Sequence, residues 1–271
     1  MSELLDLATA AARKAGAYLA PHAGAPGSTG TKSSNVDMVT EYDIGSGALI
    51  AAELMAGDPD TPLLVEEPEV YGLTGAREGT LDDEVVWVVD PIDGTTSFIH
   101  GWPAYSVSIA RVERGRVVLG VVYNVPMDEL FAAETGRGAT RNGEPISASD
   151  SDSIDRALLV TGFPYDRGQP LTRQLTVLNA LLRSVHGIRR DGTAALDCCH
   201  VACGRADGFW EYALKPWDTN AGMLVAIEAG AVASSVSGEP WTPATADVIV
   251  AAPDLHPVLL KAIRSVDPDQ A

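Results

Sequence analysis

The segment from Val85 to Phe98 constrains the fold more strongly than any other stretch of this sequence. Residues 85–89 are apolar without interruption, a run that is typical of a buried strand. The run ends at Asp90 and Asp93, and Gly94, two hydroxyl residues and a second apolar run follow. We therefore predict a strand, a tight turn and the start of a helix, with both carboxylates in the mouth of the turn.

This turn has two features that favour phosphate chemistry. Carboxylates bind hard cations such as Mg²⁺ through oxygen, and the amide groups of Gly94 and Thr95, at the start of a helix, suit a phosphate. Together they predict metal-assisted chemistry on a phosphate. For the short pattern D-x-x-D-G alone there is a structural alternative, in which Asp90 is a turn residue and Asp93 an ordinary N-cap.

The size and net charge of the chain limit its domain organisation and the classes of molecule that it can bind. With 271 residues the chain has room for one large domain or two tightly fused halves. Its net charge of −18, from 19 basic and 37 acidic residues, argues against nucleic acid or an anionic membrane as a direct partner. An acidic protein that acts on a phosphate ester needs cations to offset the repulsion, which agrees with a site that holds several metal ions.

The cysteines and the N-terminal residues indicate a cytoplasmic enzyme. Cys198, Cys199 and Cys203 are too few and too close together for a disulfide framework, so we expect a reducing compartment. Residues 1–6 are acidic and lack the basic start of a signal peptide, and no apolar run reaches the length of a membrane span. Cys199 and Cys203 have a spacing that suits a metal ion, but no further ligands follow at zinc spacing, so we assign them to the core.

The remaining patterns predict helices and hairpins. We expect helices over residues 3–20, 44–56, 170–184, 194–204, 216–230 and 255–265. We expect strands over residues 62–65, 85–89, 105–111, 116–123, 130–133, 157–163, 207–212, 231–236 and 248–252. Turns at 113–115 and 141–144 join neighbouring strands, which favours an α+β fold over an all-parallel sheet. The polar stretch 149–155 is the predicted boundary between two halves, 1–150 and 151–271.

The central turn, Asp90-Pro91-Ile92-Asp93-Gly94-Thr95-Thr96, resembles the signature of the inositol monophosphatase family. These are Mg²⁺-dependent, lithium-sensitive phosphatases related to fructose-1,6-bisphosphatase. Further blocks resemble that family in order and spacing: Lys32 to Asp43 (with Asp37 inside it), Glu66-Glu67, Arg189 to Ala195 and Trp217 to Gly222. The resemblance implies a single catalytic domain over residues 1–271, folded as a layered α/β/α/β/α sandwich. It also implies a site between the two halves and, commonly, a homodimer.

The resemblance implies two or three Mg²⁺ ions per site. Glu66, Asp90 and the carbonyl of Ile92 would hold the first ion, and Asp90, Asp93 and Asp218 the second. A third, weaker ion would share Glu66. The alternatives are structural, with Glu66 as part of a solvated pair and Asp218 as an N-cap.

The resemblance also assigns catalytic residues. Thr95, backed by Asp43, would orient the attacking water, and Glu66 would act beside them through the metal ions. Asp43 is also expected to be the N-cap of the helix over residues 44–56. Because adjacent side chains of an extended chain point to opposite sides, only one of Glu66 and Glu67 should face the metals.

Substrate contacts follow from the same resemblance. The amide groups of Gly94 and Thr95 would hold the phosphate, and Asp93 and Glu211 would bind hydroxyl groups of a polyol. The backbone of the turn at Thr193 and Ala194 would contact the same hydroxyl groups. The expected partner is therefore a small phosphorylated polyol.

Inositol 1-phosphate is the expected substrate. The alternative is histidinol phosphate, although relatives with that activity tend to carry lysine where this chain has Thr96. Fructose 1,6-bisphosphate and adenosine 3′,5′-bisphosphate are less favoured, because the sequence shows no extra basic cluster and only four lysines. A chain that acts mainly as a regulatory binding partner, as bacterial relatives can in transcription complexes, is a further alternative.

Two residues depart from the family pattern. Gly47 stands where the family usually has glutamate, and Val65 stands where it has glycine. With Gly45, Gly47 should weaken its helix by roughly 0.5–1 kcal/mol for each glycine relative to alanine.

Overall fold

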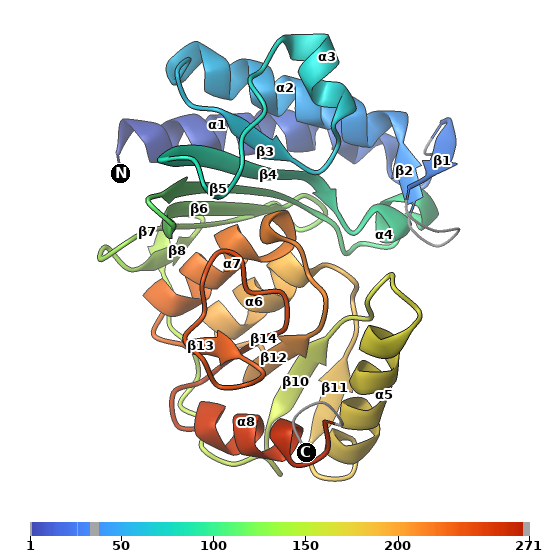
Figure 1. The fold of residues 1–271 in the computed structure, drawn as a ribbon, viewed down its shortest axis with the longest axis vertical. Coiled ribbons are helices and arrows are strands. Elements are labelled where there is room, and N and C mark those ends of the chain that lie inside the picture. The colour runs from blue at the N-terminus through green and yellow to red at the C-terminus, as the bar shows by residue number, and fades with distance from the viewer. Residues whose placement is uncertain (1, 26, 33–37, 268–271) are drawn as a thin grey trace.

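A computed structural model of the chain describes residues 2–25, 27–32 and 38–267, so the predicted family residue Asp37 lies outside the described residues. Within that part of the chain, helices and sheets alternate in five layers (Figure 1). The predicted α+β fold and the layered α/β/α/β/α sandwich are therefore confirmed.

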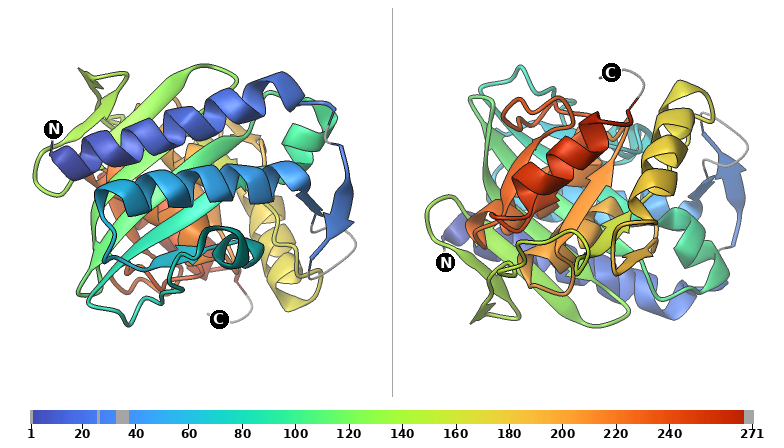
Figure 2. Two further views of the ribbon diagram at one scale, coloured as in Figure 1. Left: turned by 90° about the horizontal axis from the view of Figure 1, so that it is seen from above. Right: turned by 90° about the horizontal axis from the view of Figure 1, so that it is seen from below.

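The first layer consists of helices on the outer face of the larger sheet. α1 (Glu3–Leu19) and α2 (Glu41–Gly57) lie side by side on that face (Figure 2). η1 (Ala20–His22) directly follows α1, and α3 (Glu69–Thr74) packs against α2. The Ser2 hydroxyl caps α1 by accepting a hydrogen bond of 3.2 Å from a backbone N–H of the first turn. Most buried residues of α1 are alanines, so this helix packs closely against its neighbours.

The start of α2 corrects the prediction that Asp43 is an N-cap. The N-cap is Thr40, whose hydroxyl accepts a hydrogen bond from the N–H of Tyr42 at 3.1 Å. Asp43 is the third residue of the helix, and its Oδ2 accepts hydrogen bonds from Thr40 N–H at 2.7 Å and Thr40 Oγ1 at 2.6 Å. This capping box fixes the position of the Asp43 carboxylate.

The glycine at position 47 has a packing role. A Cβ atom on Gly47 would lie 2.6 Å from Cγ2 of Val70 and 3.1 Å from Cγ of Pro91. A glutamate therefore has no room here unless α3 or the central turn moves. The expected weakening of the helix stays a prediction.

The larger sheet has the strand order β3-β4-β5-β6-β7-β8-β9. Its strands are β3 (Leu63–Val65), β4 (Val85–Asp93), β5 (Ser106–Glu113), β6 (Arg116–Asn124), β7 (Glu129–Glu134), β8 (Ala139–Arg141) and β9 (Glu144–Pro145). β3 pairs with β4 in parallel, and every other neighbouring pair is antiparallel. A separate antiparallel pair consists of β1 (Thr29–Thr31) and β2 (Met38–Thr40).

Two hairpin turns in this sheet agree with the prediction. Arg114 and Gly115 have φ values of 49° and 72°, and Asn142 and Gly143 have φ values of 51° and 83°. Two successive residues with positive φ are typical of the type I′ turns that join antiparallel strands. The hairpin-rich character of the first half is therefore confirmed.

β4 extends further than the apolar run predicts. It continues to Asp93, and its pairing with β5 shifts register between Asp90 and Asp93. This irregularity accommodates Pro91, which has no N–H to donate to a sheet. Gly94 follows with φ 94°, and the short helix α4 (Thr95–His100) begins after it. The strand, turn and helix start are thus confirmed, with a longer strand.

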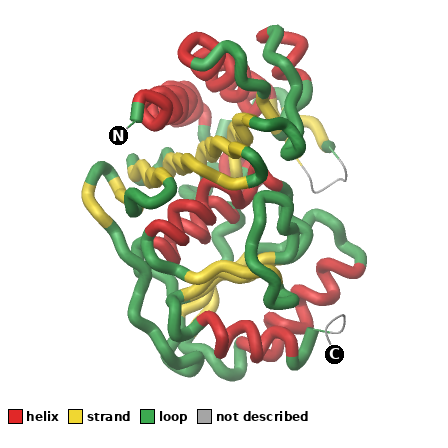
Figure 3. The backbone as a smooth tube through the Cα atoms, turned by 60° about the vertical axis from the view of Figure 1, so that its left-hand side comes forward, coloured by secondary structure: helices red, strands yellow, loops and turns green. Residues whose placement is uncertain are grey.

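The middle layer consists of α6 (Ala194–Ala202) and α7 (Pro216–Glu228), which lie between the two sheets (Figure 3). Glycines permit this close packing. A Cβ atom on Gly120 of β6 would lie 2.6 Å from a carbonyl oxygen of α7. A Cβ atom on Gly222 of α7 would lie 2.7 Å from a carbonyl oxygen of α6.

The cysteines lie in and directly after α6 as free thiols. Cys198 and Cys199 are buried, whereas Cys203 is partly buried. Cys199 thus belongs to the core as predicted, and Cys203 packs at its edge.

The smaller sheet has the strand order β11-β10-β12-β14-β13. Its strands are β10 (Leu158–Thr161), β11 (Gly187–Arg189), β12 (Gly208–Glu211), β13 (Val232–Ser235) and β14 (Val248–Ala251). β10 pairs in parallel with β11 and β12, and the remaining pairs are antiparallel. α5 (Gln169–Leu181) and α8 (His256–Arg264) form the last layer, on the side away from the larger sheet (Figure 2).

Within the described residues, no helix is both long enough and apolar enough to cross a membrane.

Candidate active site

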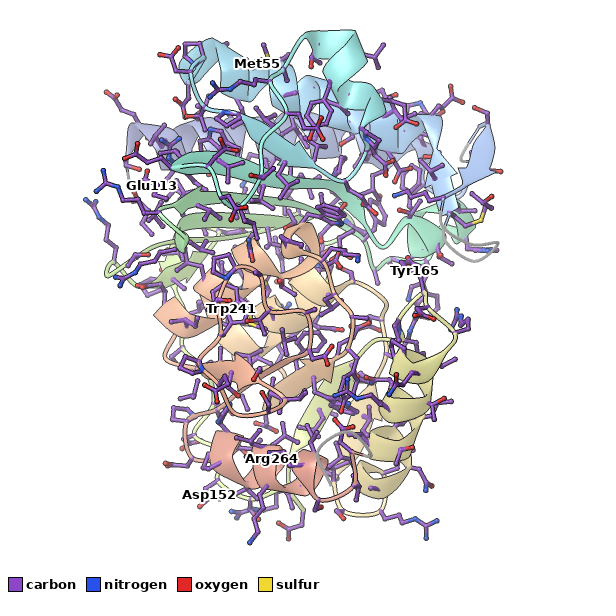
Figure 4. All side chains as sticks on the ribbon, in the orientation of Figure 1. Met55, Glu113, Asp152, Tyr165, Trp241 and Arg264 are labelled. Atoms are coloured by element: carbon purple, nitrogen blue, oxygen red, sulfur yellow. The ribbon has the colours of Figure 1, made fainter. Side chains whose placement is uncertain are left out.

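A cavity of about 410 Å³ is lined by residues from both halves of the chain. Five predicted site residues line it: Glu66, Asp93, Ala194, Glu211 and Asp218. The other predicted site residues are buried: Asp43, Asp90, Ile92, Gly94, Thr95 and Thr193. Tyr165 also lines the cavity and lies at the end of the second half that faces α4 (Figure 4).

The central turn connects the two halves through Asp93. Its Oδ2 accepts a hydrogen bond from the N–H of Ala195 at 2.8 Å and another from the hydroxyl of Thr193. Both donors belong to the start of α6. Asp90 stays within its own turn, where its Oδ1 accepts a hydrogen bond from the N–H of Ile92 at 3.0 Å. The two carboxylates of the D-x-x-D-G pattern therefore have different local partners.

Burial and mutual repulsion raise the pKa values of the acidic residues around this turn. Burial is the largest cause for Asp90, and the carboxylates of Glu66, Asp93 and Asp218 raise its pKa further. Burial raises the pKa of Asp93 to about 7, although hydrogen bonds from the second half oppose the rise. For Asp218, burial and then Glu66 raise the pKa. Four carboxylates, two from the central turn and one each from Glu66 and Asp218, thus repel one another.

This set of donors suits a hard cation. All four side chains offer oxygen, and a bound cation would offset the repulsion that raises their pKa values. Among the described residues, however, no three or more His, Cys, Asp or Glu side chains have the spacing of a metal centre. Other partners hold the carboxylates: Glu66 pairs with Lys32, and Asp90 and Asp218 accept backbone N–H groups at 3.0 and 2.7 Å. The ligand set stays a prediction.

Lys32 corrects the expectation that Glu66 and Glu67 point to opposite sides. The Nζ atom of Lys32 lies 2.7 Å from Oε1 of Glu66 and also contacts Oε1 of Glu67. The chain bends directly after β3, so the alternation of an extended strand does not continue. Burial lowers the pKa of Lys32, but the two carboxylates more than offset this and raise it. Burial in turn raises the pKa of Glu67 to about 7, although Lys32 opposes the rise.

Thr95 and Asp43 are in contact, as the resemblance implies. Thr95 Oγ1 lies 3.0 Å from Oδ1 of Asp43 and 3.1 Å from the carbonyl oxygen of Ile92. One hydroxyl hydrogen serves one acceptor at a time, and the carboxylate is the stronger acceptor. Burial raises the pKa of Asp43, although the hydrogen bonds from Thr40 oppose the rise. The catalytic role of the pair stays a prediction.

Glu211 is held against the backbone that follows β10. A Cβ atom on Gly162 would lie 2.5 Å from Cδ of Glu211 and closer still to both carboxylate oxygens. Only glycine leaves room for the carboxylate in this position. Burial and, to a lesser extent, the charge of Asp93 raise the pKa of Glu211 to about 8, although Arg190 opposes the rise.

Two predicted substrate residues have structural contacts. The hydroxyl of Thr193 donates to Asp93 and lies 3.2 Å from Oγ of Ser106, so the side chain is already occupied. A Cβ atom on Gly94 would lie 2.9 Å from the carbonyl oxygen of Ala104, so only glycine fits there. The predicted backbone contacts of Thr193, Ala194 and Gly94 with substrate are compatible with this arrangement and stay predictions.

Several residues that line the cavity were not among the predicted site residues, and they include an aromatic ring and two positively charged side chains. Phe163 follows β10, Arg190 precedes α6 and Lys215 precedes α7. Arg190 lies inside the block from Arg189 to Ala195, but at a position where that pattern fixes no residue type. All three residues lie in connections, and these connections meet through the pairing of β10, β11 and β12. The cavity therefore has more positive charge than the sequence predicted.

Comparisons with known proteins place this chain among related sequences and structures. The model of the inositol monophosphatase family matches residues 1–267. An inositol-1-monophosphatase of Synechocystis is 37% identical over 261 residues, covering 96% of this chain and 88% of that protein. The Nus factor SuhB of Escherichia coli K12 is 37% identical over 266 residues, covering 97% of each chain. The solved structure of a Thermotoga maritima IMPase has a TM-score of 0.89 at 31% identity and covers 100% of both chains.

Proposed function

The chain belongs to the inositol monophosphatase family, and we propose that it is a Mg²⁺-dependent, lithium-sensitive phosphatase whose substrate is inositol 1-phosphate. The observation that carries the proposal is the cavity lined by Glu66, Asp93 and Asp218, with the contact between Thr95 and Asp43 behind it. The family implies a phosphatase that acts on a small phosphorylated substrate. Mg²⁺, lithium sensitivity and the particular ester are our proposals.

The proposed cation ligands are Glu66, Asp90, the carbonyl of Ile92, Asp93 and Asp218. Their oxygen donors and their mutual repulsion suit Mg²⁺. When bound there, Mg²⁺ would lower the pKa of the attacking water and neutralise charge on the phosphate. Lys32 would compete with cations for Glu66, because their ion pair at 2.7 Å uses one carboxylate oxygen.

Thr95 would orient the attacking water. If the Thr95 hydroxyl donates its hydrogen to Asp43, its lone pairs are left to accept a hydrogen bond from water. The capping box holds Asp43 in the orientation that this requires. No serine or cysteine nucleophile enters this mechanism, and the three cysteines are buried or partly buried.

The polyol would lie between Asp93, Ala194 and Glu211, which line one cavity. Glu211 would accept hydrogen bonds from its hydroxyl groups. The amide groups of Gly94 and Thr95 would contact the phosphate. Histidinol phosphate remains the alternative substrate, and Thr96 in place of lysine favours inositol 1-phosphate.

Phosphate release from inositol 1-phosphate tests the proposal. We expect release that requires Mg²⁺, falls with lithium and is lost in Asp90→Asn. Asp207→Asn is a control, because its carboxylate accepts hydrogen bonds from Ser149 and Leu158, outside the residues that line the cavity. Phosphate release from histidinol phosphate but not from inositol 1-phosphate would identify histidinol phosphate as the substrate and leave the proposed mechanism unchanged. No Mg²⁺-dependent release from either ester would refute the proposal.

A role as a binding partner is the second candidate function. Relatives named Nus factor SuhB, at 37% identity over nearly the whole chain, favour it. The test is complementation of a deletion strain by Asp90→Asn, which should lack catalysis. Full complementation would support a binding role independent of catalysis, and failure to complement would count against it.

We also propose a cytoplasmic homodimer. The free thiols of Cys198, Cys199 and Cys203 agree with a reducing compartment. Light scattering during size-exclusion chromatography measures the oligomeric state directly, and a monomer at micromolar concentration would contradict the dimer.

A further inference from the structure

Arg190 presents a guanidinium group on the wall of the cavity. Its Cζ atom lies 5.5 Å from the centre of the Phe163 ring. The guanidinium also lies over Gly192, where a Cβ atom would be 2.7 Å from Nη1 of Arg190. Within the described part of the chain, this guanidinium has neither a hydrogen bond nor an ion pair. The Phe163 ring thus supports the guanidinium on one side, while its donors remain available.

The carboxylate of Glu211 has a matching support. Gly162 leaves room for that carboxylate, and the next residue, Phe163, packs against Arg190. Gly162 and Phe163, the two residues after β10, thus contact the acceptor Glu211 and the donor Arg190, respectively, and all four residues line the cavity. The two groups do not form an ion pair with each other in the described structure, so both can contact a third molecule.

We propose that Arg190 is a specificity-determining residue that binds hydroxyl groups of the substrate together with Glu211. Arg190 would donate hydrogen bonds to one hydroxyl oxygen, and Glu211 would accept a hydrogen bond from another. This inference rests on the proposed function, because it concerns the alcohol portion of the phosphate ester.

The proposed pair favours one chemical class of alcohol. A guanidinium has five N–H donors, no acceptor and a permanent positive charge. Hydroxyl oxygens satisfy such donors, whereas a cationic alcohol would be repelled by Arg190. Arg190 therefore favours a neutral polyol phosphate over an amino-alcohol phosphate, which separates inositol 1-phosphate from histidinol phosphate.

The first test compares inositol 1-phosphate with phenyl phosphate, whose alcohol portion has no further hydroxyl group. The readout is the ratio of the two kcat/KM values. In Arg190→Gln the ratio should fall by about tenfold or more, because a hydrogen bond from a charged donor is lost. Arg189→Gln is the control, because it removes the same charge from the adjacent residue, which does not line the cavity. The Nη1 atom of Arg189 donates a hydrogen bond of 3.1 Å to the carbonyl oxygen of Ile188. The ratio in Arg189→Gln should stay within about twofold of the wild-type ratio.

The second test looks for an increased preference for one substrate rather than for a loss of activity. Arg190→Glu should raise the preference for histidinol phosphate over inositol 1-phosphate by about tenfold or more, because repulsion becomes attraction. A misfolded variant would not show such a gain. Thermal unfolding of each variant checks the fold, which should persist because Arg190 is exposed.

The two proposals fail in different ways. If wild-type protein releases phosphate but Arg190→Gln leaves the ratio unchanged, the role of Arg190 is overturned and the proposed function stands. An equal fall in Arg189→Gln would also overturn it, because the effect would then be one of general charge. No Mg²⁺-dependent release by wild-type protein from any of the three esters would refute the proposed function itself.

Discussion

Substitution of Gly162 by alanine should weaken substrate recognition by Glu211 while leaving the stability of the fold nearly unchanged. The new Cβ atom would lie 2.5 Å from Cδ of Glu211, whereas ordinary contacts begin at 3.4 Å. The carboxylate must therefore move by about 1 Å. A displacement of that size in a positioned group can lower a rate by about a hundredfold. We expect kcat/KM for inositol 1-phosphate to fall between about tenfold and a hundredfold.

The same substitution should have little effect on folding. The φ of Gly162 lies outside the left-handed region, so alanine adopts this backbone conformation without strain. The clashing atoms belong to the flexible end of a side chain, which can move at low cost. We expect the free energy of unfolding to change by less than about 1 kcal/mol, because alanine also restricts the unfolded chain.

The assay measures kcat/KM and thermal unfolding for Gly162→Ala and for the control Gly72→Ala. A Cβ atom on Gly72 meets nothing within 4 Å, and this residue lies in α3, so the control should keep full activity. An unchanged kcat/KM in Gly162→Ala with an intact fold would refute the substrate role of Glu211. A fall of equal size with phenyl phosphate would also refute it, because that alcohol offers no further hydroxyl group.

Three further predictions concern metal binding and stability. Without Mg²⁺, Asp90→Asn should unfold at the same or a higher temperature than wild type, because one repelling carboxylate is gone. Added Mg²⁺ should raise the unfolding temperature of wild type but not that of Asp90→Asn. Gly222→Ala should lower the free energy of unfolding in urea by about 1–3 kcal/mol, because its Cβ atom would meet a carbonyl oxygen of α6 at 2.7 Å. The hydrogen bonds from Arg205 hold the pKa of Glu129 below its usual range, so their stabilisation is present above about pH 4.5 and is lost as the pH falls further. Arg205→Gln should therefore lower the free energy of unfolding by up to about 1 kcal/mol at pH 7 and by less at pH 3.5.

Local patterns predicted most of the fold. The turn at Asn142 and Gly143 needs two residues with positive φ, and the residue types alone indicate it. The N-cap of α2 was harder to predict than this turn. Thr40, three residues before Asp43, can also cap a helix, and only the structure shows which of the two residues does so. β4 was predicted too short, because Pro91 usually ends a strand and here it occupies an irregularity.

The cavity wall was harder to predict than the central turn. The turn brings Asp90 and Asp93 together within four residues, so a motif reveals it. Phe163 and Arg190 are separated by 27 positions (190 − 163) and meet only because β10 pairs with β11, which ends directly before Arg190. The pairing of strands in the smaller sheet brings these two side chains together, and no periodicity in the sequence predicts that contact.

Asp93 makes the proposed metal site and the packing of the two halves interdependent. Its Oδ2 accepts hydrogen bonds from Thr193 and Ala195 at the start of α6, so this oxygen fixes the middle layer against β4. α6 packs against α7, and the first turn of α7 contains Asp218. The position of one proposed ligand therefore depends on the hydrogen bonds of another. A substitution at Asp93 changes ligand geometry and packing at once, whereas Asp90 bonds within its own turn. Asp90→Asn is for this reason the cleaner test of catalysis by bound cations.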